Sequence, residues 1–225
     1  MSAHFQREIN KLKQQVLSLC TMVEGQVEKA VRAVQLRDDE LAAEVERLDE
    51  EIDLCEIEVE EECLKTLALY QPVAIDLRFV VSTLKMNHDL ERIGDLAVNI
   101  ARKVRGLVLD PPPELSCDLG LMCEKTQYLL RDSIDALVSL NASEAASICK
   151  RDDEIDQMKA TIRKEIEITI RQRPDKVGSL LRLLAVSRNL ERIADLATSI
   201  AEDVIYLVEG RIVRHPMLTA TRNGG

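Results

Sequence analysis

Apolar residues recur along this chain with the period of a helix. One series steps by four or three residues and comprises Leu41, Val45, Leu48, Ile52, Cys55, Val59 and Cys63. A second series has the same rhythm and comprises Met86, Leu90, Ile93, Ala97, Ile100 and Val104. Such spacing forms an apolar seam along one side of a helix and favours packing at small crossing angles. Because no segment alternates with the period of a strand, the pattern predicts an all-α chain.

Helix breakers divide the chain into six long segments. Prolines stand at positions 72, 111–113, 174 and 216, and uninterrupted stretches of about 25 to 35 residues are typical of helical bundles. The first three helices are predicted over 2–37, from a cap at Asp38 or Asp39 to 70, and over 73–109. The last three are predicted over 114–140, from a cap at Asn141 or Ser143 to 173, and over 174–208.

Asp110 and the three prolines after it form a stiff connector that cannot be helical. This connector predicts a boundary between an N-terminal three-helix bundle, residues 1–110, and a C-terminal three-helix bundle, residues 114–210. Residues 211–225 are expected to form a flexible tail.

The two halves repeat each other in sequence. Residues 90–101 recur as residues 190–201 with nine of twelve positions identical, and residues 49–53 match residues 152–156 at nearly the same offset. An apolar seam alone does not require the polar residues Glu91, Arg92 and Asp95 to reappear in register. We therefore infer that one three-helix unit was duplicated, and we predict two tandem, pseudo-symmetric three-helix bundles built from six long helices.

The overall charge argues against two classes of partner. The formal net charge is −10 and aromatic residues make up only 2% of the chain, so its field repels nucleic acid and anionic lipid. No stretch approaches 18 uncharged apolar residues, which argues against direct membrane insertion. The first ten residues also lack the apolar region of a secretion signal. We expect a cytoplasmic protein.

The cysteines are expected to be structural. They show no C-x-x-C pair and no neighbouring histidine, so the spacing of a zinc site is missing. We expect most of them to be buried, reduced thiols that pack as small hydrophobic groups. The six are Cys20, Cys55, Cys63, Cys117, Cys123 and Cys149.

Each repeated segment carries two acids four residues apart, which places them on one face of a helix. With 40 acids in 225 residues, about seven such pairs arise by chance, so a single pair usually marks a solvated face. Asp49, Asp53 and Glu91, however, each follow an apolar seam residue by one position, so two helices can bring four carboxylates together. Converging like charges need a compensating cation. The pairs are Asp49 with Asp53, Glu91 with Asp95, Asp152 with Asp156, and Glu191 with Asp195.

Oxygen ligands without cysteine or histidine favour hard ions, namely magnesium, manganese or iron, over zinc. A different interpretation is that Arg92 and Arg192 neutralise the acids through ordinary salt bridges. A ferritin-like di-iron oxidase would need Glu-x-x-His on two helices, whereas the chain has only the reversed order from His88 to Glu91. No phosphate loop, nucleophile elbow or catalytic triad is visible.

At these residues the sequence resembles the PhoU family, and the likeness covers nearly the whole chain. It rests on Asp-x-x-x-Asp at 49–53 and 152–156, and on Glu-Arg-Ile-Gly/Ala-Asp-Leu-Ala at 91–97 and 191–197. The resemblance implies two three-helix bundles, often dimeric, with multinuclear metal clusters held by these carboxylates. Metal ligation then falls on Asp49, Asp53, Glu91 and Asp95 in the first half and on Asp152, Asp156, Glu191 and Asp195 in the second.

The resemblance also implies a function. PhoU proteins act as negative regulators of the phosphate-starvation response and link a phosphate ABC transporter, through its ATPase subunit, to a sensor histidine kinase. We therefore expect a non-enzymatic, metal-binding adaptor that forms a homodimer and has those two partners. The alternative is a metal-dependent helical-bundle enzyme or a metal-storage protein.

Overall fold

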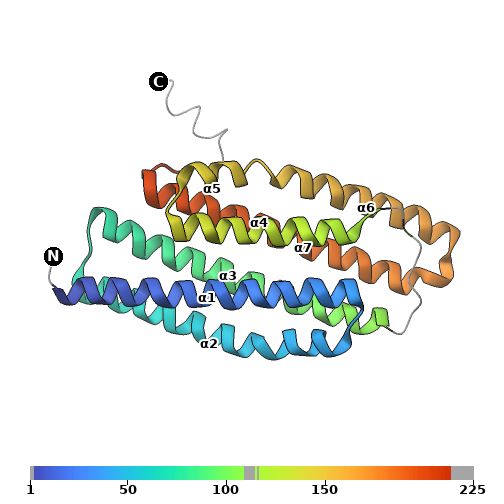
Figure 1. Cartoon of the computed structure of the whole chain (residues 1–225), viewed down its shortest axis with the longest axis horizontal. Coiled ribbons are helices and arrows are strands. Elements are labelled where there is room, and N and C mark those ends of the chain that lie inside the picture. The colour runs from blue at the N-terminus through green and yellow to red at the C-terminus, as the bar shows by residue number, and fades with distance from the viewer. Residues whose placement is uncertain (1–2, 109–114, 116, 214–225) are drawn as a thin grey trace, which may run out of the picture.

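The computed structural model describes residues 3–108, 115 and 117–213. The first half contains three long helices, which are α1 (Ala3–Leu36), α2 (Asp39–Tyr70) and α3 (Ala74–Val108). The second half contains α4 (Leu119–Ser139), α5 (Ala142–Ile148), α6 (Asp152–Gln172), a single 3-10 turn η1 (Pro174–Lys176) and α7 (Val177–Glu209). The described part has no strand, so the predicted all-α fold of six long helices is confirmed (Figure 1).

The predicted seams are the inner faces of α2 and α3. All six members of the second seam, from Met86 to Val104, are buried, and Val45, Ile52, Val59 and Cys63 of the first are buried as well. The predicted cap at Asp38 is also confirmed, because its carboxylate accepts hydrogen bonds from the backbone N–H groups of Glu40 and Leu41. Such a cap satisfies donors that a helix start leaves open.

The predicted single helix up to residue 173 is wrong, because the chain forms two helices there. The break covers Cys149, Lys150 and Arg151, after which α6 begins with the three acids Asp152, Asp153 and Glu154. Negative charges in a first turn stabilise a helix start. The apolar pattern did not reveal this break because Ile148 and Ile155, on either side of it, are both buried and one heptad apart.

Two other predicted helix starts need correction. Helix α4 begins at Leu119 and not at residue 114, because the Asp118 carboxylate accepts a hydrogen bond from the backbone N–H of Leu121 and caps the helix there. The last helix was predicted from Pro174, but Pro174 begins the 3-10 turn and α7 follows from Val177. The connector at residues 110–113 and most of the tail lie outside the described residues.

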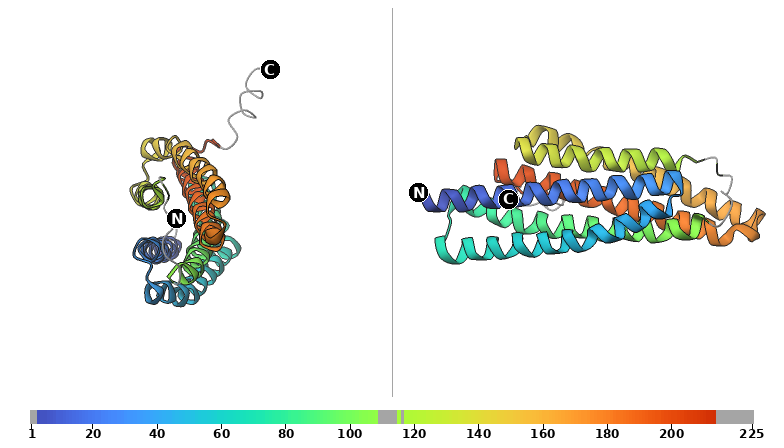
Figure 2. Two further views of the ribbon diagram at one scale, coloured as in Figure 1. Left: turned by 90° about the vertical axis from the view of Figure 1, so that its right-hand side faces the viewer. Right: turned by 60° about the horizontal axis from the view of Figure 1, so that its bottom comes forward.

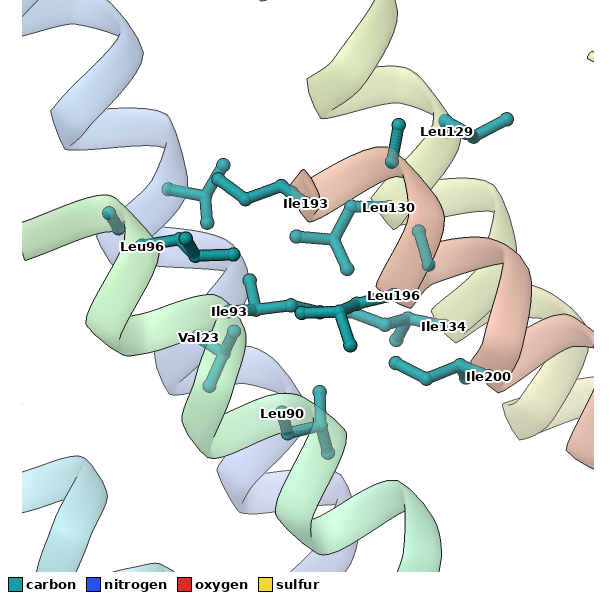
Figure 3. Close-up of a cluster of buried hydrophobic side chains, with 14 of the residues drawn as sticks. Val23, Leu90, Ile93, Leu96, Leu129, Leu130, Ile134, Ile193, Leu196 and Ile200 are labelled. Atoms are coloured by element: carbon teal, nitrogen blue, oxygen red, sulfur yellow. The ribbon is translucent and has the colours of Figure 1, made fainter. Parts of the chain in front are cut away.

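Helices α3 and α7 lie antiparallel at the centre and join the two halves (Figures 1 and 2). Gly106 near the end of α3 adjoins Arg182 near the start of α7, and Lys85 of α3 lies 3.8 Å from Asp203 of α7. Where the helices cross, Ile93 of α3 lies beside Leu196 of α7, and Leu96 lies beside Ile193, so each contact is repeated between the equivalent residues of the other half (Figure 3).

Such a reciprocal pair of contacts is the property of a twofold axis. The pseudo-twofold axis that relates the halves therefore passes through this crossing. Buried side chains of both halves join in one continuous hydrophobic cluster, so the halves share a core. No helix of the described residues is long and apolar enough to cross a membrane.

The cysteines follow the prediction in part. Cys20, Cys63 and Cys123 are buried, the other three are half-buried, and all six are free thiols. Burial raises the pKa of the Cys20 and Cys123 thiols to about 12. These two thiols therefore stay protonated at neutral pH and act as core residues.

Candidate metal centres on the two bundles

The repeated motif on α3 divides its side chains between the core and one outer face. Leu90, Ile93 and Ala97 are buried, whereas Glu91 is half-buried and Asp95 is exposed. The acids of α2, Asp49 and Asp53, follow the buried or half-buried seam residues Leu48 and Ile52 by one position. The predicted acids of the first half therefore flank the contact between α2 and α3.

The four predicted acids of the first half are electrostatic neighbours. Burial raises the pKa of Asp49, and the charges of Asp53 and Asp95 add to that rise while a hydrogen bond from Gln26 opposes it. Burial, then the charge of Asp95 and that of Asp53, raise the pKa of Glu91. The structure thus brings Asp53 and Asp95 together on the same side of the bundle, as the sequence predicted.

A buried amide of the neighbouring helix α1 positions the Asp49 carboxylate. The Gln26 side chain of α1 is fully buried, and its Nε2 donates to the Val45 carbonyl at 3.1 Å and to Asp49 Oδ1 at 3.3 Å. Its Oε1 is buried with no hydrogen-bond partner among the described residues. Gly94 makes room for this amide, because a Cβ there would lie 3.0 Å from Gln26 Oε1.

A fifth acid, Glu56, joins the first cluster. Asn87 of α3 positions it by donating from Nδ2 to the Glu56 carboxylate at 2.9 Å and to its backbone carbonyl at 3.0 Å. Burial and the charge of Glu60 raise the pKa of Glu56, His88 opposes the rise, and Asp53 adds to it. Exposed His88 lies 3.7 Å from Glu91, and a shallow pocket lies between these acids and the histidine.

The second half repeats the arrangement on α6 and α7. Burial raises the pKa of Asp152, and the charges of Asp156, Asp153 and Glu191 add to the rise. Asp195 is affected most, because burial and the charges of Glu191, Asp152 and Asp156 raise its pKa to about 6. All four predicted acids of this half are again neighbours, so their repulsion is built into both bundles.

The second cluster contains a lysine, Lys159, that was not among the predicted site residues. Lys159 of α6 occupies the position that corresponds to Glu56, since the α2 and α6 segments match at an offset of 103 residues. Its Nζ lies 2.5 Å from Glu191 and 3.6 Å from Asp156. The second cluster is therefore partly neutralised from within, whereas the first gains an additional negative charge.

The arginines of the motif do not neutralise the acids. Arg92 and Arg192 are both exposed, and within residues 3–108 and 117–213 neither forms an ion pair with a carboxylate. The salt-bridge alternative therefore fails for these two residues and applies only to Lys159. Glu56 and Lys159 could have been found from the sequence, because each follows the first acid of its pair by one heptad.

The chemistry of the donors suits a hard cation. Both faces offer carboxylate oxygens, and the first adds the unpartnered amide oxygen of Gln26. As the side chains stand, no group of three or more His, Cys, Asp or Glu in the described residues is positioned to hold a metal ion. Ligation would therefore require the half-exposed carboxylates to rotate towards one another, a motion that their repulsion opposes until a cation is present.

Comparisons with known proteins agree with this architecture. The PhoU domain profile matches residues 16–104 and 119–204. The PhoU homologue of Clostridium acetobutylicum, a phosphate-specific transport system accessory protein, is 33% identical over 93% of this chain and 96% of its own length. An equivalent homologue from Aquifex aeolicus is 34% identical over 93% of this chain and 95% of its own.

Two solved structures share the fold closely. The crystal structure of PhoU from Pseudomonas aeruginosa has a TM-score of 0.89 and 34% identity, and covers 92% of this chain and all of its own. That of the regulatory protein PhoU from Streptococcus pneumoniae has a TM-score of 0.84 and 32% identity, with 93% and 99% covered. Since the profile matches both repeats and these relatives match nearly the whole length, the chain belongs to the PhoU family.

Proposed function

We propose that this protein regulates phosphate uptake and represses the phosphate-starvation response as a cytoplasmic, homodimeric, metal-binding adaptor. Its partners are the ATPase subunit of a phosphate ABC transporter and a sensor histidine kinase. The observation that carries the proposal is similarity over nearly the full length to phosphate-specific transport system accessory proteins. Those relatives are named as accessory or regulatory proteins, which is consistent with a protein that is not an enzyme.

The metal part of the proposal rests on the two carboxylate faces. Asp49, Asp53, Glu91 and Asp95 would hold hard cations on the first, with Glu56 in reach. Asp152, Asp156, Glu191 and Asp195 would hold them on the second. A bound cation would supply positive charge that relieves the repulsion behind the raised pKa values. It would also tie α2 to α3 and α6 to α7, which stiffens the outer face on which an adaptor meets its partners.

Gene deletion tests the regulatory role. A strain without this gene should express its phosphate-starvation genes even in rich phosphate, and the wild-type gene should restore repression. Normal repression in the deletion strain would contradict the proposal. Binding of the purified transporter ATPase subunit and of the kinase, measured by pull-down with the full chain, tests the two partners separately.

Metal analysis tests the sites without any activity assay. Purified protein loaded with manganese should hold a few ions per chain, and the double variant Asp49→Ala/Glu91→Ala should lose the ions of one face. Glu61→Ala, which removes an exposed acid elsewhere on α2, is the matched control. Equal metal content in the double variant and the wild type would rule out this assignment, and ferroxidase turnover would favour the enzyme alternative.

A further inference from the structure

A cavity of about 380 Å³ opens between the two halves, far from both carboxylate faces. It lies at the end of the molecule where α1 and α3 begin and α4 and α7 end, on the left in Figure 1. Its walls are mainly apolar and include Ile9, Val16, Phe79, Met86, Leu137 and Leu207. This volume falls within the range of roughly 300–1,000 Å³ that is typical of small-molecule sites.

Polar groups without partners line this apolar cavity. Thr83 is fully buried, and neither its Oγ1 nor the buried Nε of Arg78 has a hydrogen-bond partner among the described residues. Lys13 also lines the cavity, with its Nζ 5.4 Å from the centre of the Phe79 ring. Buried donors without partners are costly, and the two cations outnumber the one lining acid, Asp76. The polar part of the cavity therefore suits an anion.

The mouth of the cavity is apolar and open. Ile75, Val138 and Leu140 line it and are 65%, 57% and 49% exposed. Exposed apolar side chains at the opening of a cavity can contact the apolar part of a ligand. A ligand that fits must therefore combine a long apolar body with a small anionic head.

At the opposite end of the pseudo-symmetric molecule, two arginines lie against the last turn of α3. Arg37 donates from Nη1 to the Leu107 carbonyl at 3.0 Å, and the side chain of Arg182 lies against Gly106. The repeat offsets of 103 and 100 residues place Leu140 and Ser82 at the corresponding positions of the open end. Arg37 and Leu140 even share a left-handed backbone, with φ of 53° and 51°. At the open end Leu140 lines the cavity and, unlike Arg37, has no long polar side chain that could reach across it.

We propose that this cavity binds a free medium-chain fatty acid. The carboxylate lies at Arg78 and Lys13, with Thr83 as a further donor, and the acyl chain lies along the apolar walls towards Val138 and Leu140. A partner helix fits less well, because a cylinder about 10–12 Å wide can only cover the opening and leaves the buried polar groups unsatisfied. An anionic membrane is disfavoured by the net charge of −10.

Calorimetric titration of the full chain with decanoate, kept below its micelle concentration, tests the proposal. Wild-type protein should bind one decanoate per chain. Leu140→Arg, which introduces the residue that the first repeat has at the corresponding position, Arg37, should weaken binding at least about tenfold. Leu64→Arg, at an exposed apolar position on α2, should leave it unchanged. Arg78→Gln should weaken decanoate about tenfold but leave the uncharged analogue decanol unaffected. Circular dichroism checks that the variants remain helical.

Three outcomes would overturn the proposal. One is the absence of saturable decanoate binding to the wild type. Another is equal affinity of wild type and Leu140→Arg. The third is cosedimentation with phosphatidylglycerol vesicles without binding of monomeric decanoate, which would indicate a membrane contact instead. Metal content should be the same in every variant. A change in decanoate binding then does not depend on metal binding at the carboxylate faces.

Discussion

The charge difference between the two carboxylate faces predicts that the two faces bind cations with different affinity. Glu56 stands in the first cluster where Lys159 stands in the second, so their local charges differ by two units. Lys159→Glu should make the second face resemble the first and bind manganese more tightly. Glu56→Lys should weaken the first face by a similar factor.

The size of the effect follows from Coulomb's law. A divalent cation and a unit charge about 8 Å apart interact by about 1 kcal/mol in water. Two charge units therefore amount to about 2 kcal/mol, which salt at 0.1 M reduces to about 1 kcal/mol because the Debye length is about 10 Å. Roughly a fivefold change in Kd is expected. Release of Glu191 from Lys159, now 2.5 Å away, acts in the same direction.

Isothermal titration of chelator-treated protein with manganese measures the two affinities. The wild type should show two classes of site, and Lys159→Glu should merge them. Lys164→Glu on α6 and Glu61→Lys on α2 make the same charge changes at exposed positions and serve as controls. If the wild type shows one class of site, or if Lys164→Glu acts as strongly as Lys159→Glu, the electrostatic reasoning is wrong.

Three other perturbations have defined outcomes. Gln26→Leu introduces leucine, the residue that the second half has at the equivalent position, Leu129. The change removes a buried oxygen that has no hydrogen-bond partner, so it should raise the free energy of unfolding of the metal-free protein by about 1 kcal/mol in urea unfolding. Burial and neighbouring carboxylates raise the pKa of Asp195 to about 6 in the fold, above its unfolded value, so the metal-free protein should lose stability as pH rises from about 4 to about 6. Asp195→Asn should remove the Asp195 share of that loss, about 1 kcal/mol or less after solvent screening, in melts across this pH range, while the raised pKa values of Asp49, Glu91 and Asp152 maintain the rest. A fragment of residues 1–110 exposes the α3 face around Ile93 and Leu96 and should dimerise in sedimentation experiments, whereas a monomeric fragment would argue against the twofold contact.

The sequence predicted the features that depend on regular spacing. The seam from Met86 to Val104 is buried as expected, and the carboxylates of each half are neighbours because their positions relative to the seams are fixed by helix geometry. The cap at Asp38 was also visible, since a short acid before an apolar series is the usual helix start.

Features that depend on tertiary contacts were not predictable in this way. The break before α6 preserves the heptad phase of Ile148 and Ile155, so periodicity could not detect it. The support of Asp49 by Gln26 comes from a different helix and requires the space above Gly94. The cavity lies between side chains of four helices, among them Thr83 of α3 and Leu137 of α4, so no single segment of the sequence reveals it.

The crossing of α3 and α7 has a consequence for how such a protein arises. Because Ile93 meets Leu196 while Leu96 meets Ile193, the same surface would let a single-repeat ancestor pair with itself. Fusion of two gene copies would turn that pairing into an internal contact and allow each copy to mutate alone. A substitution such as glutamate to lysine, which in an ancestral dimer would alter both faces at once, could then be confined to one.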